Sequence, residues 1–404
     1  MNKNILEKKL KEIDSIIKVQ YKNENQIGVL TGLSGISLFQ FYYSKYLGID
    51  EHADIGIKIL ENSINKINEG YNFSTYCTGI AGAGWVLDHL KQENFIDTNS
   101  DSLLSELDDF LHEMMIKDMR NGNYDFLHGA IGYTFYFLNR YKNTKSNKLK
   151  ENYKTILLEF IDLLEGISDR GSENNLRWLS VLNRETGEKG YNLSLSHGMS
   201  SIIGILTKLF EHEDFKINTE ITLKKTISYI LSFKNEDNNS FSLFPSLVSE
   251  NGDIDYKSRL AWCYGDLGIG IRFWYAGKAI KDKNLCNTAI SIMKHAAYRI
   301  TPESNMVVDA GVCHGSYGNA QIFHRMFKET NNFLFKEATE FWIQDGINKA
   351  TYNDGYAGYK QWKGGDKQWE SEISLLEGIA GIGLTIIDYL ADFDTNWDEC
   401  LMIS

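Results

Sequence analysis

Two cysteines and a histidine stand at matched places in short glycine-containing motifs of this chain. Cys263 lies in the segment AWCYG and Cys313 in the segment GVCHG, where His314 follows it directly. Two thiolates and an imidazole are typical zinc ligands, and three protein ligands leave the fourth position open, as in catalytic zinc sites. Such a centre lowers the pKa of a further thiol and keeps it nucleophilic. The motifs therefore predict a catalytic zinc site that activates a thiol.

Acid–base residues occupy the same place in related motifs. His197 precedes a glycine in LSLSHG, and His128 does so in YDFLHG, so the spacing alone does not separate their roles. An imidazole, with an ordinary pKa near ~6.5, suits general acid or base catalysis. Asp125 is a candidate for orienting a histidine or exchanging a proton, with a helix cap as the alternative. Arg259 is a candidate for stabilising an enolate-like anion, with a surface charge as the alternative.

These residues share one phase of an internal repeat. The pattern G-x-x-G starts at seven positions, with Ser201 replacing the second glycine of the fourth copy: Gly32, Gly79, Gly129, Gly198, Gly265, Gly315 and Gly378. An apolar run at helical spacing follows each copy, and amphipathic segments such as 57–67 and 103–119 lie between the copies. A basic period of roughly 47 to 50 residues holds two helices and two loops. Each repeat is therefore predicted to be an αα-hairpin.

The seven hairpins are predicted to close into a ring. An open solenoid needs polar repeats at its ends, whereas the last repeat, LLEGIAGIGLTIIDYL, is as apolar as an internal one. The fold class is thus all-α, a closed α/α toroid in a single domain over residues 1–404. Its glycines are expected to let crowded inner helices approach closely. Segments 169–195 and 235–259 are rich in Asn, Ser, Gly and aromatic residues and are expected to be insertions with some β-structure.

The composition excludes several classes of protein. The chain has 404 residues with 34 glycines and only 2 prolines, which favours long helices. A formal net charge of −12 argues against nucleic-acid binding. No apolar stretch reaches the ~18 residues of a membrane span, and the charged N-terminus does not resemble a signal peptide. Five cysteines are too few for a disulfide scaffold in a chain of this length.

The remaining cysteines and the aromatic residues beside the motifs are expected to be structural. Cys77 shares the phase of the metal cysteines, but its repeat lies across a seven-membered ring from theirs. Cys286 and Cys400 are out of phase and are expected to be inert. Trp262 and Tyr264 are expected, from the pattern alone, to pack the pocket and not to react.

At WCYGDLG, CHGSYG and LSHG the chain resembles the lanthionine synthetase C family, the lantibiotic cyclases of class I lanthipeptide biosynthesis. The resemblance extends from about Gly32 to Leu384. It implies an α/α toroid with one zinc ion bound by Cys263, Cys313 and His314. The implied reaction is the addition of peptide cysteines to dehydroalanine or dehydrobutyrine, which gives lanthionine or methyllanthionine rings.

The resemblance also implies roles for the other residues. His197 matches the histidine of the family's SHG motif, and Asp125 matches the aspartate of its YD segment. Arg259 and Tyr264 match an arginine and a tyrosine around the first metal cysteine, whereas His128 has no role in the family. The implied substrate is a dehydrated precursor peptide with leader and core. The implied setting is the cytoplasm, with a dehydratase and an export transporter as partners at the membrane.

Three other functions are compatible with parts of the pattern. A thiol S-transferase, prenyltransferase-like or glutathione-adding, would use the same zinc chemistry on the same toroid. A non-catalytic, zinc-stabilised peptide-binding scaffold would have a closed four-ligand site that includes Cys77. A metal-free glycosidase is the weakest alternative, because no carboxylate pair is evident at the shared phase.

Overall fold

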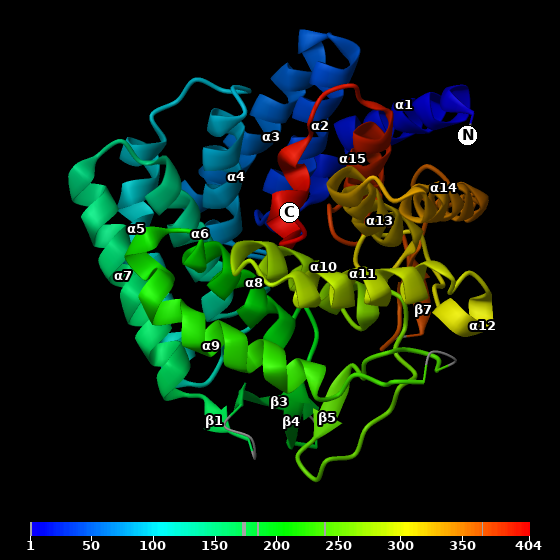
Figure 1. Cartoon of the computed structure of the whole chain (residues 1–404). Helices are drawn as coiled ribbons and strands as arrows, with labels where there is room; N and C mark the ends of the chain where they lie inside the picture. Colours follow the sequence, from blue (N-terminus) through cyan, green and yellow to red (C-terminus); the bar gives the residue numbers. More distant parts are fainter. Residues whose placement is uncertain (1, 172–174, 184–185, 238–239, 366) are drawn as a thin grey trace. The chain divides into compact units, whose positions relative to one another are not determined.

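The described residues of the computed structural model are 2–171, 175–183, 186–237, 240–365 and 367–404 (Figure 1). Parts of both expected insertions, 172–174, 184–185 and 238–239, therefore lie outside the described residues. The chain forms two compact units. The first comprises residues 1–98 and 306–404, and the second comprises residues 99–305.

The first unit joins the beginning of the chain to its end. Its elements are α1 (Lys3–Gln20), η1 (Tyr21–Asn23), α2 (Leu33–Leu47), α3 (Asp50–Asn68), α4 (Ile80–Gln92), α13 (Ser316–Thr330), α14 (Phe333–Asn348), β6 (Gln361–Lys363), β7 (Gln368–Glu370), α15 (Ile379–Leu390) and η2 (Asn396–Leu401). Helix α15 packs against α2 and α13, and α1 packs against α15 (Figure 1). The last repeat therefore contacts the first, which an open solenoid does not allow. Helix α1 supplies the outer partner of α15.

The second unit has two layers of helices. Its elements are α5 (Ser100–Arg120), α6 (Ala130–Asn143), α7 (Asn147–Gly166), β1 (Asp169–Arg170), β2 (Leu176–Arg177), β3 (Leu179–Asn183), β4 (Glu188–Asn192), α8 (Met199–Phe210), α9 (Glu213–Leu231), β5 (Leu247–Ser249), α10 (Asp266–Ala279), α11 (Lys283–Ala297) and α12 (Pro302–Asn305). Helices α6, α8 and α10 pack side by side, and α5, α7 and α9 form a second row (Figure 1). The expected helical hairpins are present, such as α8 with α9 and α10 with α11.

The sequence of each helix explains the layer in which it lies. In α8 every residue except Lys208 is buried, as expected of a helix that is apolar nearly all round. In α11 the buried residues recur at helical spacing and leave a charged face outside, for example Leu285, Ala289 and Ile292. Asp282 caps α11 by accepting hydrogen bonds from the backbone N–H groups of the first turn.

The second glycine of the G-x-x-G pattern leaves room for the loop before the helix in several repeats. A Cβ atom on Gly318 would overlap the carbonyl oxygen of Val312, and one on Gly381 would overlap that of Leu375. Each carbonyl belongs to the glycine's own repeat. These glycines let the loop fold back onto its own helix. The expected close approach between neighbouring repeats is also present, since a Cβ atom on Gly381 would lie 2.7 Å from Cγ2 of Val312.

Both expected insertions contain β-structure. Strand β4 pairs with β3 and β5 in an antiparallel sheet, so the insertions 169–195 and 235–259 are joined to each other. A third insertion was not predicted. It lies between α14 and α15 and carries the β6–β7 hairpin, in which Trp362 pairs with Trp369.

Candidate functional site

Backbone hydrogen bonds connect the loops before neighbouring inner helices. In the second unit the carbonyl oxygen of Cys263 accepts from the N–H groups of Leu195, at 3.1 Å, and Ser196, at 3.3 Å. These bonds join the loop before α10 to the loop before α8. They place the segments that contain Cys263 and His197 next to each other.

The first unit repeats this arrangement. The carbonyl oxygen of Leu376 accepts from Val312 at 3.0 Å and from Cys313 at 2.8 Å, and Leu376 itself donates to the carbonyl of Leu30 at 2.8 Å. The carbonyl oxygen of Cys77 accepts from Thr31 at 2.9 Å. In each case the acceptor residue stands two positions before the first glycine of its repeat. The phase seen in the sequence is therefore a shared hydrogen-bonding position.

His197 and Asp125 form a close pair in the second unit. Nδ1 of His197 lies 2.6 Å from Oδ2 of Asp125, and both side chains are partly exposed. The other oxygen of Asp125 accepts from the backbone N–H groups of Leu127, at 2.7 Å, and His128, at 2.8 Å. The carboxylate is thus fixed by its own loop and orients the imidazole.

The environment keeps Asp125 ionised. Burial raises the pKa of this carboxyl, but the hydrogen bond and charge of His197 and the backbone N–H of His128 outweigh burial, so that its pKa lies below the ordinary value. An ionised carboxylate accepts the Nδ1 proton of the imidazole and stabilises its protonated form. The pair therefore has the arrangement of a general acid or base with its orienting residue.

Other predicted residues surround this pair. The rings of Tyr264 and His197 lie 6.3 Å apart between centroids, and the ring of His128 stacks on that of His197 at 6.2 Å. The ring of Tyr264 therefore lies near the pair, and its expected packing role stays a prediction. Arg259 is half-buried, and its guanidinium makes no hydrogen bond or ion pair with any other described residue. A guanidinium of this kind is available to an anionic group.

The three predicted metal ligands are divided between the units. Cys263 is buried in the second unit, whereas Cys313 and His314 are half-buried in the first. Nε2 of His314 lies 3.0 Å from Oδ2 of Asp309, a buried carboxylate. Burial raises the pKa of Asp309, but His314 and the backbone N–H groups of Trp362 and Gly311 lower it more. A carboxylate at one ring nitrogen is the usual support of a histidine that binds metal through the other.

Asp309 was missed in the sequence. It stands six residues before Gly315, in a loop where only the residues next to the glycine attracted attention. The comparable signal was Asp125, four residues before Gly129. In both loops an acidic residue upstream of the glycine lies next to a histidine.

The remaining cysteines have apolar or local surroundings. Cys77 is buried, and its Sγ lies 3.7 Å from Oγ1 of Thr31. Burial raises the pKa of the Cys286 and Cys400 thiols, which is typical of structural cysteines. Trp262 is fully buried, as expected of a packing residue.

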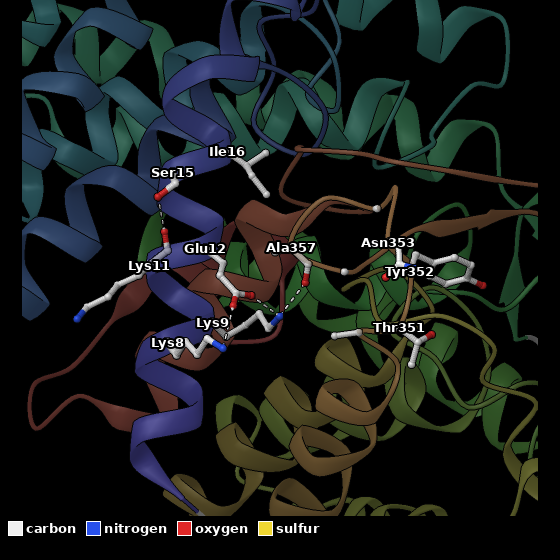
Figure 2. A pocket seen from close by; sticks show the side chains of 13 residues that line it. Lys8, Lys9, Lys11, Glu12, Ser15, Ile16, Thr351, Tyr352, Asn353 and Ala357 are labelled. Atoms are coloured by element: carbon white, nitrogen blue, oxygen red, sulfur yellow. Dashed lines mark hydrogen bonds and ion pairs between the residues drawn. The ribbon is translucent and has the colours of Figure 1, made fainter.

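A groove in the first unit lies between α1 and the segment 350–358 (Figure 2). Its volume is about 670 Å³. The ammonium group of Lys9 lies 2.6 Å from Glu12 and 2.7 Å from the carbonyl oxygen of Ala357, so the charge of Lys9 is balanced within the groove. None of the predicted site residues lines this groove. Across the described residues, every helix is too short or too polar to bridge a lipid bilayer.

The match to known proteins spans both units. The family model described as "Lanthionine synthetase C-like protein" matches residues 24–402. The chain belongs to this family. The resemblance to the lanthionine synthetase C family, first seen at the cysteine and histidine motifs, is thereby confirmed.

Relatives of this lanthionine synthetase C-like protein agree with that assignment. "Nisin biosynthesis protein NisC" of Lactococcus lactis subsp. lactis is 25% identical over 411 residues, covering 94% of this chain and 89% of that protein. The solved structure of a "Nisin cyclase" matches with a TM-score of 0.72 and 20% identity, covering 100% of this chain and 98% of that chain. This likeness shows the fold, and the expected all-α class of helical hairpins is confirmed.

Proposed function

We propose that this chain is a zinc-dependent peptide cyclase, a lanthionine synthetase. It would add cysteine thiols of a dehydrated precursor peptide to dehydroalanine or dehydrobutyrine residues of the same peptide. The observation that carries the proposal is the 2.6 Å contact between His197 and Asp125 beside the loop that contains Cys263, in a chain of this family. The addition forms one C–S bond at the β-carbon and one C–H bond at the α-carbon, and it consumes the S–H bond of the thiol and the C=C π bond of the dehydro residue. No leaving group departs.

Cys263, Cys313 and His314 would hold the zinc ion. The chemistry of the donors fits, since two thiolates and one imidazole leave a fourth position open. With Nε2 of His314 next to the carboxylate of Asp309, Nδ1 would be the atom that binds the metal. When bound, zinc in such a set lowers the pKa of a substrate thiol.

His197 would move protons at its Nε2 atom. Because Nδ1 is held by Asp125, Nε2 would be the atom that meets the substrate. As a base it would take the thiol proton, and as an acid it would deliver a proton to the α-carbon. Arg259 would stabilise the negative charge that develops on the carbonyl oxygen of the dehydro residue, and Tyr264 would hold the imidazole in place.

A dehydrated precursor peptide tests the proposal. Incubation with the zinc-loaded protein should leave the mass of the peptide unchanged and remove its free thiols. Retention of all free thiols over many protein equivalents would contradict cyclisation. A gain in mass equal to a thiol donor would favour the S-transferase alternative.

The scaffold alternative makes a separate prediction about Cys77. A closed four-ligand site would lose its metal in Cys77→Ser, whereas the proposed three-ligand site would keep it. The contact between Cys77 and Thr31 supports a structural role for this cysteine. Assembly with a dehydratase and an export transporter, and a cytoplasmic location, belong to the same proposal and rest on the family resemblance.

A further inference from the structure

A buried ion pair joins the beginning of α10 to the segment that follows α11. Nη1 of Arg299 lies 3.2 Å from Oδ2 of Asp266, and the side chains are 5% and 0% exposed. A buried ion pair is weak evidence for stability, because removing two charges from water offsets most of their attraction. The backbone groups that this pair binds are therefore more informative than the pair itself.

The two side chains bind three further segments of the backbone. Asp266 accepts hydrogen bonds from the N–H groups of Leu243, at 3.1 Å, and Phe244, at 3.0 Å. Arg299 donates through Nε to the carbonyl oxygen of Ser304, at 2.9 Å, and through Nη2 to that of Ser258. The pair thus connects the insertion 235–259 to α10 and α12.

Arg259 directly follows one of these anchored groups. On one side of it the carbonyl of Ser258 is held by Arg299, and on the other the N–H of Leu260 donates to the carbonyl oxygen of Asn305 at 2.9 Å. Gly265, with φ of +82°, closes the same loop, because a Cβ atom there would overlap Oγ of Ser258. The backbone of Arg259 is therefore fixed on both sides.

The side chain of Arg259 has no comparable anchor. The guanidinium of Arg259 binds no other residue in the part of the chain that the structure describes. The orientation of this side chain therefore depends on the backbone that carries it. Errors of about 1 Å in the position of a catalytic group can cost on the order of 10²-fold in rate. Contacts that fix this backbone therefore affect the rate of the reaction as well as the stability of the fold.

We propose that Asp266 and Arg299 are positioning residues that hold Arg259 in place for the reaction. This role rests on the proposed cyclase function and extends it to two residues that do not touch the substrate. It requires that the effect of Arg299 on catalysis pass through Arg259.

A double-mutant cycle tests that requirement. Arg299→Lys keeps the charge but loses the fork that reaches Asp266, Ser258 and Ser304 together. We expect it to lower kcat about 10-fold in the wild-type background, with KM changed less than about 2-fold. In the background of Arg259→Ala the same substitution should change kcat less than about 2-fold. If the kcat of the double variant were reduced by the product of the two single reductions, the two residues would act independently and the proposal would be overturned.

Arg140→Lys is the matched control. Arg140 is also a buried arginine of the second unit, and its Nη2 lies 2.7 Å from Asp101, but it lies near the last turn of α6, far along the helix from Gly129. It should lower the unfolding temperature without lowering kcat. An equal loss of kcat in Arg140→Lys and Arg299→Lys would also overturn the proposal, since it would show a general effect of stability.

Two further arms keep the test decisive. If Arg299→Lys does not fold, Asp266→Asn replaces it. The same result is expected, since this substitution weakens the ion pair between Asp266 and Arg299 while keeping the size of the side chain. If the wild-type protein does not cyclise the peptide, the proposed function fails. If Arg259→Ala cyclises at the wild-type rate, only the role of Arg259, and with it this inference, fails.

Discussion

Nδ1 of His197 lies 2.6 Å from Oδ2 of Asp125, although the two residues are 72 positions apart in the chain. The loops before α6 and α8 bring them together, and two backbone N–H groups fix the carboxylate in turn. We expect Asp125→Asn to lower kcat by about 10²- to 10³-fold, because an amide does not stabilise the protonated imidazole in the same way. Single-turnover cyclisation measures this loss.

Asp108→Asn is the control for that substitution. Asp108 is a buried carboxylate of the second unit that accepts hydrogen bonds from Tyr136 at 2.8 Å and Tyr153 at 2.7 Å. Its replacement should reduce stability and leave kcat within about 2-fold of wild type. A wild-type kcat in Asp125→Asn would remove the carboxylate from the mechanism.

The lowered pKa of Asp125 predicts how stability depends on pH. Burial raises this pKa, but the hydrogen bond and charge of His197 bring it below the value of 3.8 expected in the unfolded chain. The stabilisation is therefore complete above 3.8 and is lost as the pH falls from there through the folded pKa. The difference in unfolding free energy between wild type and Asp125→Asn should narrow over that range. Urea unfolding at several pH values measures it, and a constant difference would contradict the assignment.

Metal binding should depend on Cys313 and not on Cys286. Cys313→Ala should lose zinc and cyclisation together, because it removes one of the three proposed ligands. Cys286→Ala should keep both, since the Cys286 thiol lies out of phase and burial raises its pKa. Metal analysis of the purified variants after dialysis gives the comparison. Full zinc content in Cys313→Ala would show that the ligand set is wrong.

Asp309 should affect the zinc affinity of the metal site through its contact with His314. Asp309→Asn should weaken zinc binding by about 10- to 100-fold, because His314 loses the carboxylate that orients it and makes it more basic. Asp354→Asn is the control, since Asp354 is an exposed acid of the first unit, in the insertion between α14 and α15, and it pairs with Lys360 at 2.6 Å. Competition with a chelator measures both affinities. Equal affinities in the two variants would assign Asp309 to the fold alone.

Gly318 should not tolerate a side chain. Its Cβ would overlap the carbonyl oxygen of Val312, so Gly318→Ala must displace the loop that carries Cys313. We expect a loss of about 1–3 kcal/mol in unfolding free energy, as for other overpacked sites. Gly166→Ala, where a Cβ atom meets nothing within 4 Å, should change it little. Chemical denaturation compares the two.

The sequence allowed the helical hairpins to be predicted because their pattern is strong and local. The G-x-x-G copies mark the helix starts, and a helix such as α8 is apolar on nearly every side. The shared phase also pointed to His197 and Cys263, because equivalent places in a repeat occupy equivalent places in the fold. The role of the glycines was predicted only in part, since periodicity does not show that a loop folds back onto its own helix at these positions.

Pairwise contacts at the site were harder to predict. Asp309 was missed because a single acid upstream of a motif has many ordinary roles. Its distance to His314 is set by the folding of the loop, which the sequence pattern does not show. The ion pair between Asp266 and Arg299 was missed for the same reason, although Asp266 lies inside the WCYGDLG motif. The β6–β7 hairpin was missed because its strands are only three residues long.

The packing of α1 against α15 has a consequence for biosynthesis. Leu6, Leu10, Ile13 and Ile17 form the buried face of α1, and α15 follows them only after the rest of the repeats. During translation the contacts between α1 and α15 therefore cannot form until the last repeat has left the ribosome. Contacts of such long sequence separation form slowly and leave partly folded chains prone to aggregation. We expect the nascent chain to need protection by a chaperone at its first helix until synthesis is nearly complete.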